Sequence, residues 1–139
     1  MQKLYTLSAY ETTARTFFDR LTAENTSLVL DVRLNTASQL CGFTKDKDLA
    51  FFIPKLCGAA YVHDTMFAPA KEILDAYIHN RSSWQDYSDA YGYLMEQRNA
   101  WQSYQKKYAG FSCVCLLGTA TRKRRSHSEI LYELLRRNF

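Results

Sequence analysis

Hydrophobic and polar residues follow two different patterns along the chain. Short runs that are continuously apolar, or that alternate with polar residues, predict strands, whereas apolar residues spaced three and four apart predict helices. The first pattern predicts four strands, at residues 3–8, 27–32, 58–63 and 111–117. The second pattern predicts helices at residues 12–21, 47–56, 69–107 and 126–137. The run at 27–32 is apolar almost throughout, which is typical of a strand covered on both faces.

This alternation of strands and helices predicts one α/β domain over residues 1–139. Right-handed crossovers between successive strands would give a mainly parallel sheet of about four strands, flanked by helices on both faces, of the Rossmann-like or flavodoxin-like kind. In such sheets ligands bind beyond the carboxyl ends of the strands, where the loops converge. The loops that follow the predicted strands are 8–11, 31–38, 63–69 and 118–125. We therefore expect functional side chains in these four loops.

An aromatic stripe marks the second half of the long helical segment. Its members are spaced by three, four and seven residues: Trp84, Tyr87, Tyr91, Leu94, Arg98, Trp101 and Tyr108. Bases of a nucleic acid could stack on such a stripe. A helix that packs its aromatic residues over the sheet is the expected arrangement. An exposed stripe would instead make the helix over residues 84–108 a protein-interaction module, because monomers seldom expose large apolar patches.

Length and composition restrict the class of protein. The chain has 139 residues, 47% of them hydrophobic, which is enough to form a core without disulfides or metals. No apolar run reaches the roughly 20 residues of a membrane span, and no export signal is visible, so we expect a cytoplasmic protein with reduced thiols. The thiols have no spacing typical of a zinc site, and we expect neither a metal nor a cofactor. We expect all four to be small buried residues: Cys41, Cys57, Cys113 and Cys115.

The positive charge is concentrated at the C-terminal end. Residues 1–105 contain ten Lys and Arg against twelve Asp and Glu, whereas residues 106–139 contain eight against two. This asymmetry favours an anionic partner near the C-terminal third, such as a phosphate group, a nucleotide or a nucleic acid. A solubilising basic surface would produce the same composition, and charge alone does not decide between the two.

The basic residues come directly before the predicted start of the last helix. Ser126 and Glu129 have the spacing of a capping box, in which each side chain satisfies a backbone N–H of the first turn. The free N–H groups and the positive end of the helix dipole attract anions. The segment is not a P-loop, because the second Gly and the Lys-Ser pair are absent. Cys115 and Arg122 bracket one residue too many for the loop of cysteine phosphatases.

Two other strand ends carry groups that can do chemistry. Asp31 and Arg33 point to the same side at the end of one strand, where they could hold a polar ligand, shift a neighbouring pKa or fix the long loop. His63 ends another strand and could act as an acid or a base near neutral pH. Ser126 could serve as a nucleophile only with a base and an oxyanion site beside it.

Several segments, in this order along the chain, resemble a known family. They are Tyr5-Thr6-Leu7, Asp31-Val32-Arg33 with Ser38, Gly42-Phe43-Thr44-Lys45 and Tyr61-Val62-His63. A Leu-Leu strand and a helix that opens at a histidine, His127, follow them. Together they resemble the family known as domain of unknown function 488, over nearly the whole chain. The resemblance implies a small α/β sandwich with an enzyme-like rim, which in the family ends in a Cys-Ala-Glu and then a Cys-His-Arg motif.

The chain departs from the family's pattern at the residues that suggest catalysis. Ser126 stands in place of the cysteine of Cys-His-Arg, and Ser128 in place of its arginine. Gly118-Thr119-Ala120 stands in place of Cys-Ala-Glu. Other departures are Ser8 for a glycine, Thr36 for a proline and Ala68 for a glycine. Catalysis through a thiolate is therefore not carried over, and a binding domain or an altered enzyme is favoured over a faithful member.

Three hypotheses follow from the sequence. The leading one is a rim that binds an anionic ligand, a nucleotide or a nucleic acid, through Arg33, Ser38, Lys123, Arg124, Arg125 and His127. The second is a small hydrolase or transferase acting on a nucleoside-like or phosphorylated substrate, with His63 as base, Asp31 as its partner and Ser126 as candidate nucleophile. The third is the interaction module at residues 84–108.

Overall fold

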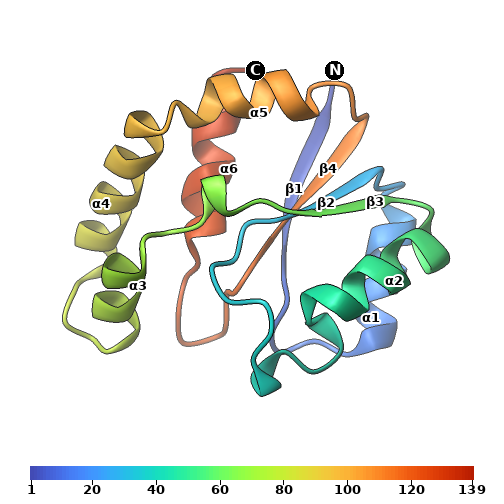
Figure 1. Cartoon of the computed structure of the whole chain (residues 1–139), viewed down its shortest axis with the longest axis horizontal. Coiled ribbons are helices and arrows are strands. Elements are labelled where there is room, and N and C mark those ends of the chain that lie inside the picture. The colour runs from blue at the N-terminus through green and yellow to red at the C-terminus, as the bar shows by residue number, and fades with distance from the viewer.

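Four parallel strands form the centre of the computed structural model, which describes residues 1–139 (Figure 1). Their order in the sheet is β1-β4-β2-β3, and all three pairings are parallel. The strands are β1 (Lys3–Ser8), β2 (Leu28–Asp31), β3 (Ala60–His63) and β4 (Cys113–Gly118). Strand β4 comes last in the sequence but lies between β1 and β2. The predicted parallel α/β sheet is therefore confirmed.

Helices cover both faces of this sheet (Figure 1). Helices α1 (Ala14–Ala23) and α2 (Asp46–Cys57) pack on one face. The other face is covered by α4 (Trp84–Gln97), α5 (Ala100–Tyr108) and α6 (His127–Arg137), and α3 (Lys71–Ile78) packs against α4. Two short 3₁₀ turns occupy Gln39–Thr44 and Thr65–Phe67. No helix combines the length and the apolar character of a membrane span.

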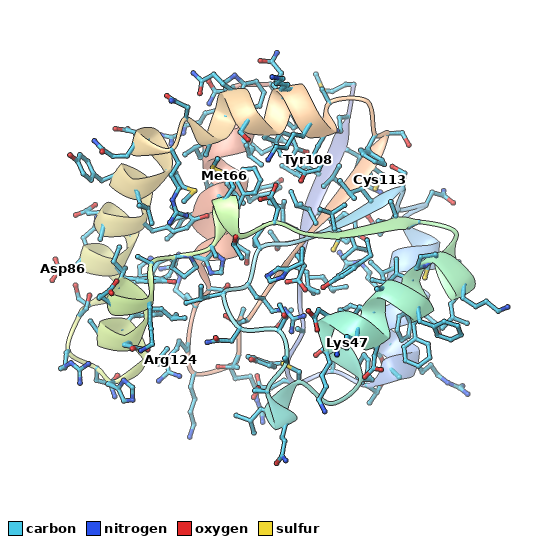
Figure 2. All side chains as sticks on the ribbon, in the orientation of Figure 1. Lys47, Met66, Asp86, Tyr108, Cys113 and Arg124 are labelled. Carbon is cyan, nitrogen blue, oxygen red and sulfur yellow. The ribbon has the colours of Figure 1, made fainter.

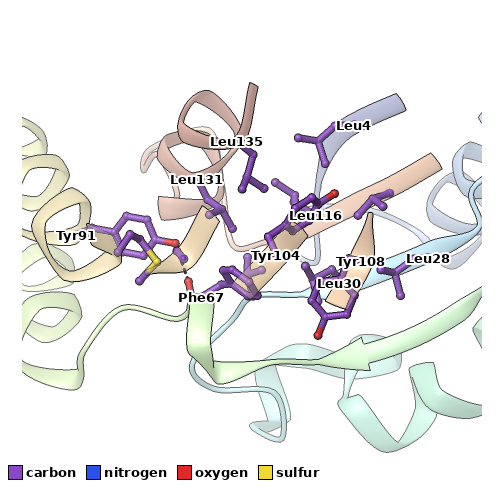
Figure 3. Packing of buried hydrophobic residues seen from close by; sticks show 14 residues of the cluster. Leu4, Leu28, Leu30, Phe67, Tyr91, Tyr104, Tyr108, Leu116, Leu131 and Leu135 are labelled. Atoms are coloured by element: carbon purple, nitrogen blue, oxygen red, sulfur yellow. Dashed lines mark hydrogen bonds between the residues drawn. The ribbon is translucent and has the colours of Figure 1, made fainter. Parts of the chain in front are cut away.

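Strand β4 shows how the sheet divides the core in two. Val114 and Leu116 point into a cluster shared with α4, α5 and α6. The alternate residues Cys113, Cys115 and Leu117 point into a second cluster, shared with α1 and α2. Side chains along a strand alternate between faces, so a strand buried on both faces is apolar at every position. Figure 3 shows the first cluster, in which the Tyr91 hydroxyl donates to the Phe67 carbonyl oxygen at 2.7 Å.

The expected long helix over residues 69–107 is three helices, and this part of the prediction is wrong. The chain turns between α4 and α5 at Asn99, whose φ of 54° is left-handed. Asparagine tolerates that conformation better than most residues, so it ends one helix and starts the next with little strain. The aromatic spacing continues across the turn, so that both helices bury tyrosines against the sheet: Tyr87, Tyr91, Tyr104 and Tyr108. Most of the surface required by the interaction-module hypothesis therefore faces the core.

Gly118 allows α6 to begin directly against the end of β4. A Cβ atom at this position would lie 2.7 Å from the Ser126 hydroxyl oxygen and equally close to the Ser128 Cβ. Any larger residue would therefore push the first turn of α6 away from the strand. The close packing places the start of α6 beside the loop that follows β2, where the candidate site lies.

Candidate functional site

The connections of the sheet create a crevice at the carboxyl ends of the strands. The chain leaves β1 and β2 toward the α1 and α2 face, but it leaves β4 toward α6 on the opposite face. Loops that diverge in this way leave room between them, and open α/β sheets bind ligands at such switch points. A cavity of about 450 Å³ lies at the same end of the sheet, between residues 9–12 after β1 and residues 40–43 after β2, whose loops both run toward the α1 and α2 face. We call it the rim pocket.

The predicted Asp31–Arg33 pair forms, and it is completely buried. Arg33 Nε lies 2.8 Å from Asp31 Oδ1 and Nη2 lies 2.7 Å from Oδ2, which is a bidentate ion pair. Nη2 also donates to the Thr44 carbonyl oxygen at 2.7 Å, and the Tyr61 hydroxyl donates to Asp31 Oδ2 at 2.5 Å. The protein itself satisfies both charges. Three roles were expected for this pair, and the geometry agrees with the one in which it fixes the long loop after β2. The guanidinium holds the Thr44 carbonyl oxygen of that loop close to the end of β2.

Cys41 is a site residue that sequence reasoning missed. Its thiol is the partner of the remaining guanidinium nitrogen, Arg33 Nη1, at 3.7 Å, and it lies 3.5 Å from the Ser38 hydroxyl. Sulfur is a weak hydrogen-bond acceptor, so this side of the guanidinium is the least well satisfied. Cys41 is buried, as expected, whereas Cys57 is only half-buried, and Cys41 also lines the rim pocket. Its position depends on the 3₁₀ turn around Gly42, whose φ of 55° leaves no periodic signal in the sequence.

Tyr10 faces the same thiol from the loop after β1. Burial raises the pKa of Tyr10, and the neighbouring Cys41 raises it further. The phenol is therefore neutral at physiological pH and can donate or accept a hydrogen bond. Tyr10, Phe43 and Cys41 all line the rim pocket, so two of its lining side chains are aromatic.

The structure does not bring Asp31 to the imidazole of His63. His63 Nε2 lies 2.8 Å from the carbonyl oxygen of Arg33, to which its N–H can donate, while Asp31 is held by Arg33 and Tyr61. The two residues are neighbours across β2 and β3, but their side chains have different partners. The role of His63 as a base stays a prediction, without the carboxylate that was expected to orient it.

His127 joins the start of α6 to the end of β2. Its Nε2 lies 2.6 Å from the Val32 carbonyl oxygen, and its ring contacts the Tyr91 ring at a centroid distance of 5.2 Å. Burial lowers the pKa of His127 to about 4, so the ring is neutral at physiological pH. Nδ1 is buried without a hydrogen-bond partner. His127 was expected to bind an anion, but its Nε2 is engaged by the Val32 carbonyl oxygen.

Ser126 caps α6, as its spacing predicts. Its hydroxyl oxygen accepts hydrogen bonds from the backbone N–H groups of Ser128 at 3.3 Å and Thr119 at 3.1 Å. The other half of the capping box is wrong, because the Glu129 carboxylate pairs with Arg125 instead of returning to the first turn. No histidine nitrogen is among the hydrogen-bond partners of the Ser126 hydroxyl. The nucleophile role therefore stays a prediction without an assembled base.

The consecutive basic residues between β4 and α6 have different environments. Arg124 lies beside α3 and donates to the Ile78 carbonyl oxygen at 3.0 Å (Figure 2). Arg125 stacks over the Trp84 ring at 4.2 Å and pairs with Glu129. These two cations tie the loop to the α3–α4 segment, which accounts for part of the basic run without a ligand.

Arg122, Lys123 and Arg125 are all exposed in this loop, but Arg122 and Lys123 do not stack on a ring or bind the α3–α4 segment, and we call these two the accessible cations. The Arg122 side chain is 93% exposed, and its guanidinium lies 3.7 Å from the Glu11 carboxylate. The Arg122 backbone N–H donates to Glu11 at 2.6 Å. Lys123 is exposed and makes no hydrogen bond or ion pair within the chain. Ser38, also expected to contact the ligand, is exposed beside Cys41.

Glu11 connects this accessible loop to the rim pocket. It lines the pocket and binds Arg122, and its backbone φ of 54° lies in the left-handed region. Such a conformation costs a non-glycine residue free energy and is enriched at functional sites. The charged loop and the pocket therefore meet at one strained residue, which sequence reasoning placed in a rim loop but did not single out.

Comparison with known proteins agrees with the resemblance seen in the sequence. The model of one family, "Domain of unknown function DUF488", matches residues 13–135. No curated protein and no solved structure matches the chain significantly. The match includes β2, β3, β4, α1 to α5 and most of α6, but it leaves out β1 and residues 9–12, which line one side of the rim pocket. The chain belongs to the DUF488 family.

Proposed function

We propose that the rim pocket and the cations beside it bind a phosphate-bearing ligand of nucleotide size. The observation that carries this proposal is the meeting of the pocket with the accessible loop at Glu11. A volume of about 450 Å³ is within the range of small-molecule sites, roughly 300–1,000 Å³. The aromatic rings of Tyr10 and Phe43 offer faces on which a base can stack.

The charges around the pocket favour an anion. Four consecutive cations, Arg122 to Arg125, are offset by the carboxylates of Glu11 and Glu129. Lys123 has no ion-pair partner in the chain. The Arg122 guanidinium lies 3.7 Å from the Glu11 carboxylate, and its side chain is 93% exposed. A phosphate group held here would gain a charge-assisted contact with Lys123 and a second with Arg122. The buried Arg33 is neutralised by Asp31 and is not among the groups that contact the ligand.

Removing the two accessible cations should weaken ligand binding. We expect the R122A/K123A variant to bind adenosine monophosphate about tenfold more weakly than the unchanged chain, since two phosphate contacts are lost. The slope of log affinity against log salt should also become shallower by about one to two units. Isothermal titration calorimetry at two salt concentrations measures both quantities.

The matched control removes the same charge at a distance from the pocket. Lys106 on α5 and Arg137 on α6 are exposed and unpaired, so the K106A/R137A variant should keep the affinity of the unchanged chain. Equal weakening in both variants would indicate non-specific charge attraction and contradict the site. Binding of a single-stranded oligonucleotide but not of the mononucleotide would move the proposal from nucleotides to nucleic acids. No binding of either at low salt would discard it.

A further inference from the structure

Helix α2 presents apolar side chains on its solvent-facing surface. Phe51 is 63% exposed and Leu56 is 56% exposed, whereas Leu49 and Ile53 on the other side are fully buried. A contiguous exposed apolar patch marks a surface that another molecule covers. This surface lies on α2, on the face of the sheet opposite α6, and is separate from the accessible cations described above.

The exposed apolar surface is continuous with the core. The Phe51 ring contacts the Phe52 ring at 5.6 Å, and Phe52 contacts Phe18 of α1 at 5.7 Å. Phe18 in turn contacts Phe17, which is 1% exposed, at 5.1 Å. Phe51 and Phe52 are therefore supported from below by packed rings. A supported aromatic pair loses little conformational freedom when a partner covers it.

Helix α2 carries an unpaired negative charge near its start and an unpaired positive charge near its end. Asp48 is in the first turn and Lys55 is in the last, and neither makes an ion pair within the chain. Both are exposed. Asp48, Phe51 and Lys55 are separated by three and four residues, so they lie on one face of the helix. We call Asp48, Phe51, Phe52, Lys55 and Leu56 the α2 face.

A two-fold axis through the centre of this face places opposite charges together. In an isologous interface each contact occurs twice. With two α2 helices antiparallel and centred between Phe51 and Phe52, Asp48 of each copy faces Lys55 of the other, and the phenylalanines meet at the centre. The partner that this pattern fits is a second copy of the same chain.

We propose that the chain forms a homodimer through antiparallel contact of the α2 faces. Sedimentation velocity over a range of concentrations tests it, with the expected result that the unchanged chain shifts from monomer to dimer as its concentration rises. The F51S, D48K and K55D variants should each raise the dissociation constant at least tenfold. The double reversal D48K/K55D should restore dimerisation, because the opposite charges again face each other.

Two controls distinguish this contact from association through a different face of the molecule. Glu133 is exposed on α6, on the opposite face of the sheet, so the charge reversal E133K should leave the dissociation constant unchanged. Thermal unfolding of each variant checks that the exposed substitutions leave the fold intact. A chain that stays monomeric at every concentration overturns the proposal. So does a dimer that resists the single reversals, or a double reversal that does not restore it, since either result would place the contact on another face or with another partner.

Discussion

Replacing Arg33 with alanine should lower the free energy of unfolding by about 3–5 kcal/mol, since removing one member of a buried ion pair leaves the other charge without a partner. Asp31 and Arg33 are both fully buried, and the guanidinium also holds the Thr44 carbonyl oxygen. In R33A the carboxylate keeps only the Tyr61 hydroxyl and the weakly placed backbone N–H of residue 33 at 3.3 Å. Such a loss is a large fraction of the total stability of a domain, roughly 5–15 kcal/mol.

Urea unfolding of R33A, R33M, D31L and the double variant D31L/R33M measures this effect. Each single variant should be strongly destabilised. The double variant should cost less than the two single variants together, because it leaves no uncompensated charge. A loss below about 1 kcal/mol in R33M, or additive losses in the double variant, would show that the pair does not fix the loop.

Acidification should destabilise the protein between about pH 6.5 and pH 4 through His127. Burial lowers the pKa of His127 to about 4 in the folded chain, while the unfolded chain keeps the ordinary value of 6.5. Between these values the unfolded state binds a proton that the folded state does not. The contribution is therefore complete above pH 6.5, falls as the pH drops and levels off below pH 4. A difference of this size corresponds to about 3 kcal/mol.

Glutamine at position 127 separates this titration from the others. A glutamine side-chain N–H can still donate to the Val32 carbonyl oxygen, but the residue does not titrate. Other groups change their charge in acid as well, including Asp64, whose pKa is lowered by its bonds to Tyr108 and Met66 against the opposing effect of burial. The comparison is therefore between the H127Q variant and the unchanged chain. H127Q should show a flatter dependence of stability on pH from 6.5 to 4, and identical slopes would refute the assignment.

The fold was predictable because its sheet and helices follow local rules. Strand β4 is apolar at nearly every position, and the structure buries all six of its residues. Ser126 has the sequence context of a cap, and it caps α6. The break at Asn99 was not predictable, because the helical spacing of the tyrosines continues across it. The strand order β1-β4-β2-β3 was also not predictable from the sequence, because it depends on which helices cover which face of the sheet.

The candidate site was predictable only in its position. The loops after β1, β2 and β4 lie at the same end of the sheet (Figure 1), where the first two line the rim pocket and the third reaches it through the contact of Arg122 with Glu11. Which charges remain free could not be read from the sequence. Arg33 is neutralised by its ion pair with Asp31. Arg124 donates a hydrogen bond to the Ile78 carbonyl oxygen at the end of α3, so neither guanidinium is free to bind a ligand. Cys41 became visible only with the 3₁₀ turn that carries it to Arg33. The Asp31–Arg33 pair is local and was expected, whereas the partner of Arg124 lies 46 residues earlier in the sequence.

The rim pocket and the accessible cations should behave as one anion site. Amide chemical shifts of the ¹⁵N-labelled chain, recorded by nuclear magnetic resonance during titration with adenosine monophosphate at low salt, test this claim most directly. We expect the shifts to be confined to residues 9–12, 40–43 and 119–127, and to saturate together with one dissociation constant. Shifts centred on α5 or on the outer side of α4, or no saturable shifts at all, would contradict it.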